Sequence, residues 1–88
     1  MKLKNGIIIT EIDGSFYAVD AGLEGKRFGG MIKMNKTAEE IARALQSETD
    51  EERLADMLCE KYDVDKDTAM KDVNRIIDGF VSAELITY

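Results

Sequence analysis

A short turn between two strand-like runs is the feature that most restricts how this chain folds. Ile7 to Ile12 and Phe16 to Val19 are rich in β-branched and aromatic residues, which favour a pleated sheet. Asp13-Gly14-Ser15 lies between them, and its glycine can adopt a positive φ without a steric penalty. Together these segments predict an antiparallel hairpin. Met31 to Met34 predicts a third short strand, reached through a glycine-rich connection over residues 21–30.

Two capping patterns predict where helices begin in the second half of the chain. Thr37 and Glu40 form a capping box, in which the threonine side chain accepts a hydrogen bond from the Glu40 backbone N–H. Asn35 is an alternative cap two residues earlier. Thr49 and Glu52 repeat the box and predict the start of a second helix.

A third helix is predicted to begin after Asp65, which is a favourable N-cap, and to run to about Ala83. The tail Leu85-Ile86-Thr87 is expected to pack back on the core. Strands followed by helices indicate an α+β fold, and 88 residues suffice for a single domain over residues 1–88. The expected core consists of Ile41, Leu45, Leu54, Leu58, Val73, Ile76 and Phe80.

The third helix has an apolar face wider than core packing needs. Its apolar residues span about 140°, whereas an arc of about 100° is enough to face a core. The surplus either makes deeper core contacts or lines a groove, and Met70 suits a groove because its side chain adapts to varied shapes. On the third strand, alternation places Ile32 and Met34 on one face, and Met31 and Lys33 on the other. An edge position would leave that strand's backbone free to pair with another strand.

Residue content excludes several chemistries. The chain has no histidine, which excludes His-based acid–base catalysis, Ser-His triads and His-ligated zinc. Its one cysteine, Cys59, excludes an internal disulfide and a Cys-built metal site. We therefore expect no enzymatic activity, no metal and no cofactor. No apolar run could span a bilayer and no signal-peptide core follows the N-terminus, so a cytoplasmic protein is expected.

Two motifs resemble ligand-binding loops but have the wrong spacing. Residues 22–27 place their glycines too close together for a phosphate loop and have Arg27 where a metal-binding hydroxyl is needed. Asp63, Asp65 and Asp67 alternate as at the start of a calcium loop, but no glycine or closing glutamate follows at the required positions. We interpret the first motif as a strand connection and the aspartates as helix-start residues.

Short segments spread along most of the chain follow the pattern of a known family. They are Phe28-Gly29-Gly30-Met31-Ile32-Lys33-Met34-Asn35-Lys36-Thr37-Ala38-Glu39-Glu40-Ile41, Tyr62-Asp63-Val64-Asp65, Asp72-Val73 and Ala83-Glu84-Leu85-Ile86. In this order and spacing they resemble the PqqD-like proteins, also called recognition elements for ribosomally synthesised and post-translationally modified peptides. Met34 and Ala42 depart from the pattern, because the family often has leucine and an aromatic residue there.

The resemblance implies a winged-helix-like fold with three strands before three helices. It also implies a non-catalytic protein that binds the leader segment of a precursor peptide and presents the peptide to a modifying enzyme, often a radical SAM enzyme. The leader would add as an antiparallel strand beside residues 31–34 and lie in a cleft against the third helix, with the side of Ile76 as the alternative cleft face. The expected peptide-binding residues are Met31, Ile32, Lys33, Met34, Met70, Lys71, Asn74, Arg75, Ile77 and Val81.

Two other functions suit such a fold, namely nucleic-acid binding and a regulatory homodimer that uses the same edge. The distribution of charge disfavours nucleic-acid binding. The net charge is −6, and residues 37–88 hold six basic and fourteen acidic residues, a balance of −8 that repels phosphate backbones. Basic side chains at Lys33, Lys71 and Arg75 would instead favour an acidic leader. We expect a monomer or a weak homodimer.

Overall fold

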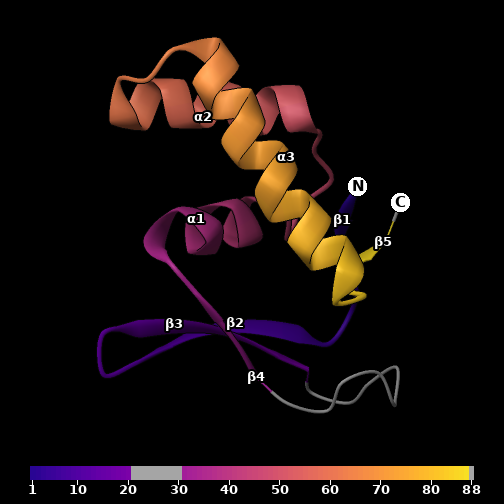
Figure 1. Ribbon diagram of the computed structural model, residues 1–88. Coiled ribbons are helices and arrows are strands. Elements are labelled where there is room, and N and C mark those ends of the chain that lie inside the picture. Colours follow the sequence, from indigo (N-terminus) through magenta and orange to yellow (C-terminus); the bar gives the residue numbers. More distant parts are fainter. Residues whose placement is uncertain (21–30, 88) are drawn as a thin grey trace.

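The chain forms a three-stranded sheet with three helices stacked on one side of it (Figure 1). The computed structural model describes residues 1–20 and 31–87. This arrangement confirms the predicted α+β fold, in which strands precede helices. The elements, in chain order, are β1 (Lys2–Leu3), β2 (Ile7–Ile12), β3 (Ser15–Asp20), β4 (Met31–Met34), α1 (Lys36–Ala44), α2 (Glu51–Tyr62), α3 (Lys66–Ser82) and β5 (Ile86–Thr87).

The predicted hairpin is confirmed. Asp13 and Gly14 both have positive φ, 52° and 81°, as a type I′ turn requires. β2 and β3 pair antiparallel through this turn, and β3 pairs antiparallel with β4, so the sheet order is β2-β3-β4. The predicted third strand is confirmed within the same bounds. The connection expected over residues 21–30 lies outside the described residues.

A second, two-stranded sheet joins the two ends of the chain. β1 pairs antiparallel with β5, and Lys2 stands opposite Thr87. The backbone N–H of Leu3 donates to the carbonyl of Leu45 at 2.8 Å, which ties β1 to the end of α1. β1 was not predicted, because two residues are too few to show alternation. Leu85 is fully buried, which confirms that the tail packs on the core.

The helix caps follow one consistent rule. Asn35, Asp50 and Asp65 each have an extended backbone, and each side chain accepts from the N–H three residues later, at 2.8, 2.9 and 2.8 Å. Asp65 was predicted correctly, but Thr37 and Thr49 were wrong as caps. Thr37 is already inside α1, and Thr49 lies one residue too early for α2. In both places an amide or carboxylate at the helix boundary caps in preference to the threonine.

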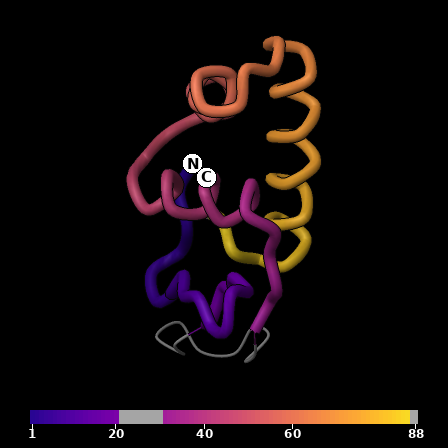
Figure 2. The backbone as a smooth tube through the Cα atoms, turned by 90° about the vertical axis from the view of Figure 1, so that its left-hand side faces the viewer, coloured from indigo at the N-terminus to yellow at the C-terminus, as the bar shows by residue number. Residues whose placement is uncertain are grey.

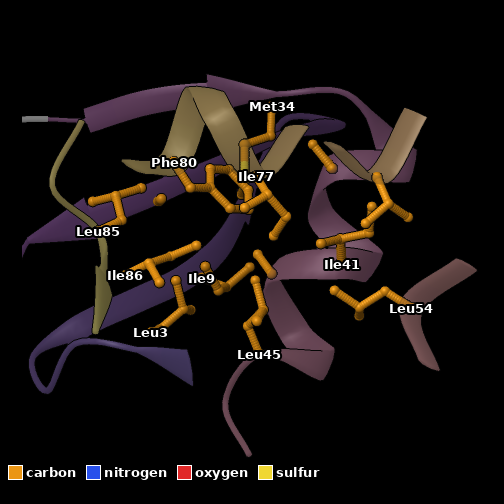
Figure 3. Close-up of a cluster of buried hydrophobic side chains, with 14 of the residues drawn as sticks. Leu3, Ile9, Met34, Ile41, Leu45, Leu54, Ile77, Phe80, Leu85 and Ile86 are labelled. Atoms are coloured by element: carbon orange, nitrogen blue, oxygen red, sulfur yellow. The ribbon is translucent and has the colours of Figure 1, made fainter. Parts of the chain in front are cut away.

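One continuous apolar core lies between the sheet and the helices (Figure 3). The view of Figure 2 shows α1 directly over the sheet and α3 running from the level of the sheet to α2. Side chains from almost every element enter the core, including Ile9 of β2 and Met34 of β4. The predicted core residues confirmed as buried are Ile41, Leu45, Leu54, Leu58, Val73 and Phe80.

The face of α3 that packs in the core differs from the predicted face, because Ile77 rather than its neighbour Ile76 is buried. Its buried residues include Val73, Ile77 and Phe80, whereas Ile76 is only half-buried, so the prediction of Ile76 as a core residue was wrong. Both isoleucines lie within the wide apolar arc, about 100° apart around the helix. Packing against the sheet and α2 therefore decides between them, and it selects Ile77.

None of the helices in the described residues has the length and apolar character needed to cross a membrane.

Candidate functional site

Among the described residues, β4 pairs with β3 alone, so its other side forms an open edge of the three-stranded sheet. The residues flanking the type I′ turn form a hydrogen-bonded pair, and bonded pairs alternate with non-bonded pairs along an antiparallel ladder. Carried across β3, this alternation directs the backbone groups of Ile32 and Met34 toward β3. The N–H and C=O groups of Met31 and Lys33 therefore face the open edge.

The side chains of β4 alternate as predicted. Ile32 is half-buried and Met34 is buried, and both face the helices. Met31, with 56% of its surface exposed, and Lys33 face the other side of the sheet. A strand added to this edge would therefore present its residues alternately to the helices and to the outer face.

A pocket lies between β4 and the C-terminal half of α3, with a volume of about 290 Å³. Most of its lining is apolar, and two cationic side chains, Lys33 and Arg75, also contribute. Figure 3 shows Phe80 beside Met34 at the base of this region. The lining residues are Ile32, Lys33, Met34, Asn35, Ala38, Arg75, Ile76, Gly79, Phe80 and Ala83.

The charged groups around the pocket are loosely held. Arg75 donates from Nη2 to Oδ1 of Asp72 at 3.3 Å, and both side chains are largely exposed, at 70% and 44%. Exposed ion pairs of this kind contribute little free energy because water and salt screen them. Arg75 can therefore turn toward another carboxylate at small cost, and Lys33 lies exposed across the pocket.

The structure brings only part of the predicted site together. Among the predicted residues, the pocket includes Ile32, Lys33, Met34 and Arg75, while Met31 lies on the adjoining outer face. Ile77 lies in the core, with 3% of its surface exposed. The other predicted residues lie on α3 but do not line the pocket, namely the half-buried Met70 and the exposed Lys71, Asn74 and Val81.

The pocket residues of α3 that are absent from the predicted set follow one stripe of the helix. Ile76, Gly79, Phe80 and Ala83 recur at intervals of three and four residues and all line the pocket. That spacing marks one helix face, the side of Ile76 that was predicted as the alternative cleft face, although the other three residues were not predicted as binding residues. The contribution of α1, through Asn35 and Ala38, had no signal of its own because it depends on where the helix packs.

A second, larger hollow of about 430 Å³ lies on α2. It is lined by Arg53, Asp56, Met57, Glu60 and Lys61, so charged side chains dominate it. It has no strand edge beside it, and its one apolar side chain offers little surface to bury. The smaller pocket beside β4 is therefore the better candidate for a binding site.

A buried carboxylate joins α1 to α2 behind the pocket. Glu40 is 8% exposed, accepts a hydrogen bond from the Tyr62 hydroxyl, and lies 2.9 Å from Lys61 Nζ. Burial raises the pKa of Glu40, but the hydrogen bonds from Tyr62 and Lys61 outweigh it and hold the pKa below its usual value. The same hydrogen bond raises the pKa of Tyr62, because it stabilises the protonated phenol.

The charges of α3 do not form a basic surface. On α3 the three basic residues Lys66, Lys71 and Arg75 are matched by three acidic ones, Asp67, Asp72 and Asp78. Lys66 is further paired with Asp56 of α2 at 2.8 Å. A helix that reads nucleic acid needs an excess of cations that can contact phosphates.

In residues 1–20 and 31–87, His, Cys, Asp and Glu form no group of three or more that could hold a metal ion.

The fold and the pocket define a small α+β domain with an open strand edge beside an apolar cleft. The sequence matches the family described as "Coenzyme PQQ synthesis protein D (PqqD)" over residues 8–86. The chain therefore belongs to the PqqD family. A comparison with curated protein sequences gives no match.

Two solved structures have a similar fold. One is described as "TbiB1 in Complex with the TbiA(beta) Leader Peptide"; it has a TM-score of 0.77 and 20% identity, covering 97% of this chain and 93% of that one. The other is described as "Lasso peptide synthetase B1 complexed with the leader peptide", with a TM-score of 0.77 and 20% identity over 99% and 96%. At this identity the similarity is one of fold.

Proposed function

We propose that this chain binds the leader segment of a ribosomally synthesised precursor peptide and presents that peptide to a modifying enzyme. The observation that carries the proposal is the open edge of β4 beside an apolar pocket against α3, in a member of the PqqD family. Both solved structures of similar fold are described as complexes with a leader peptide, which supports the same class of ligand here.

The leader pairs antiparallel with β4 in this proposal. The backbone groups of Met31 and Lys33 supply main-chain hydrogen bonds, which give affinity with little dependence on sequence. Peptide residues opposite Ile32 and Met34 point their side chains toward α3 and enter the pocket, which gives selectivity. Ile77 supports the pocket from the core.

Charge favours an acidic leader. Lys33, Arg75 and Lys71 lie along one path beside the pocket and the exposed side of α3, and their side chains attract carboxylates. Such exposed charges act mainly by speeding the encounter at low salt. Met70, Asn74 and Val81 lie on the side of α3 away from the stripe formed by Ile76, Gly79 and Ala83, so this binding mode gives them no contact with the leader.

The chain acts by binding and has no turnover of its own. It lacks histidine and has a single half-buried cysteine, so the modifying enzyme supplies the chemistry. The family resemblance favours a radical SAM enzyme as that partner. We further propose that the protein works in the cytoplasm, as a monomer or a weak homodimer.

An amide-shift titration tests the proposal. The probe is the synthetic leader peptide of a candidate precursor, and its scrambled sequence is the control. Shifts should concentrate in residues 31–36 and 75–83 and should be absent with the scrambled peptide. Shifts confined to residues 50–62, or modification of the precursor by this protein alone, would contradict the proposal.

A further inference from the structure

Gly79 lies inside α3 without a structural need for glycine. Glycine inside a helix is destabilising relative to alanine, so it usually has a conformational or packing reason. Neither reason applies here. Its φ lies outside the positive range that favours glycine, and a Cβ added at this position meets no described atom within 4 Å.

The space above Gly79 belongs to the pocket beside β4. Gly79 lines that pocket between Ile76 and Ala83, and Ile32 and Met34 line it from the strand. At about 290 Å³ the pocket is at the lower end of the range for small-molecule sites, roughly 300–1,000 Å³. An opening of this size, with apolar walls, suits one or two large apolar side chains.

We infer that Gly79 determines which peptide side chain the cleft accepts: the missing Cβ admits one large apolar side chain, such as leucine, methionine or phenylalanine. This inference rests on the proposed function and names the sequence class of its ligand. In an added strand, the neighbour of the inserted residue lies on the outer face near Lys33. A carboxylate there is favoured by charge, so the cleft selects a large apolar residue next to an acidic one.

A phage-displayed library of random peptides tests this without knowledge of the natural leader. The library is selected separately on the wild-type chain, on Gly79→Ala and Gly79→Leu, and on Asp78→Leu. The last is the matched control, because Asp78 is exposed and does not line the pocket. Wild type and Asp78→Leu should enrich peptides with a large apolar residue beside an acidic one. Gly79→Leu should select small residues at that position or enrich no peptide.

A double-mutant cycle measures the coupling between the inserted side chain and position 79. It combines one enriched peptide and its alanine variant with wild type and Gly79→Leu. Replacing its large apolar residue by alanine should weaken binding to wild type by roughly 10- to 100-fold, the range expected for burying one such side chain. The same replacement should change binding to Gly79→Leu by less than about threefold. Gly79→Ala should fold with a raised unfolding midpoint and an intermediate loss of binding, and it serves as the test variant if Gly79→Leu fails to fold.

The possible results of these experiments distinguish the role of Gly79 from the proposed peptide-binding function. Enrichment of the same peptides by wild type and both Gly79 variants would overturn the role of Gly79 and leave peptide binding intact. Failure of the wild-type chain to enrich any peptide would overturn the proposed function, and this inference with it.

Discussion

The two outer strands of the sheet, β2 and β4, both have an open edge but differ in what lies beside them. β2 is longer, and two of its exposed side chains are apolar, Ile8 at 51% and Ile12 at 47%. The hollow at its start has only about 190 Å³, and its lining includes Lys2 and Lys4. β4 has four residues and borders the larger, mainly apolar pocket against α3.

The difference shows that an open edge alone does not make a peptide site. Both strands offer unpaired backbone groups, which any extended chain could use. At β4 a second surface lies beside the edge and can bury the side chains of the incoming strand. At β2 the described residues provide no comparable apolar surface, so the side chains of an added strand would find less to pack against there.

The largest effect on stability is expected from Phe80, the buried residue of α3 that lines the pocket beside β4. Phe80→Ala should lower the free energy of unfolding by about 3–5 kcal/mol. Ile12→Ala, on the exposed side of β2, should change it by less than about 0.5 kcal/mol. Urea denaturation of both variants checks the contrast. Equal losses of unfolding free energy in the two variants would mean that the residues beside β4 and those on β2 contribute equally to core packing.

Blocking one backbone donor should separate the two edges directly. Lys33→Pro removes an N–H that faces the open edge of β4, so binding of an enriched peptide should weaken about 10- to 100-fold. Glu11 has the equivalent position on β2, opposite Phe16 in a non-bonded pair, so Glu11→Pro should leave binding unchanged. Isothermal titration of both variants, with Lys33→Ala to account for the lost charge, gives the comparison.

The result could go against this assignment in two ways. Equal weakening by both proline variants would show that they act through the fold rather than through an edge. Weakening by Glu11→Pro alone would place the peptide on β2.

The smallest effect is expected from the buried carboxylate, which lies away from both edges. The pKa of Glu40 is lowered in the folded state, so its stabilisation is complete above the ordinary glutamate pKa of 4.5 and is lost as pH falls through the folded value. Tyr62→Phe should lower the unfolding midpoint at pH 7, and the deficit should shrink at lower pH. Peptide affinity at pH 7 should not change. A deficit that grows on acidification would refute this account of Glu40.

Local signals predicted much of the fold. The Asp13-Gly14 turn, the three strand segments and the Asp65 cap depend on backbone preferences of a few residues, and they are where the sequence placed them. β1 could not be found, because its two residues form a strand only by pairing with β5 from the other end of the chain. The cap at Asn35 was predicted only as the alternative and the cap at Asp50 was missed, because the sequence offers two capping residues at each boundary.

The site was harder to predict than the fold, because it depends on the rotation of α3. Ile76 and Ile77 are both apolar and adjacent, and the sequence pattern cannot say which one meets the core. When Ile77 rather than Ile76 meets the core, the residues of α3 that line the pocket belong to a different stripe of the helix. Gly79 is visible in the sequence as a glycine inside a predicted helix, but its role depends on the space around it, which only the structure shows.

The pairing of β1 with β5 has a consequence for the order of folding. Lys2 and Thr87 lie at opposite ends of the chain and side by side in the structure (Figures 1 and 2). Contacts this distant in sequence carry the largest loop-closure entropy, so they form late. Leu85 lies directly before β5, and its N–H donates to the carbonyl of Phe80 at 2.9 Å, so the same pairing also holds the end of α3. We expect the end of α3 to be secured only after β1 and β5 have paired, so that the peptide cleft is among the last parts of the fold to form.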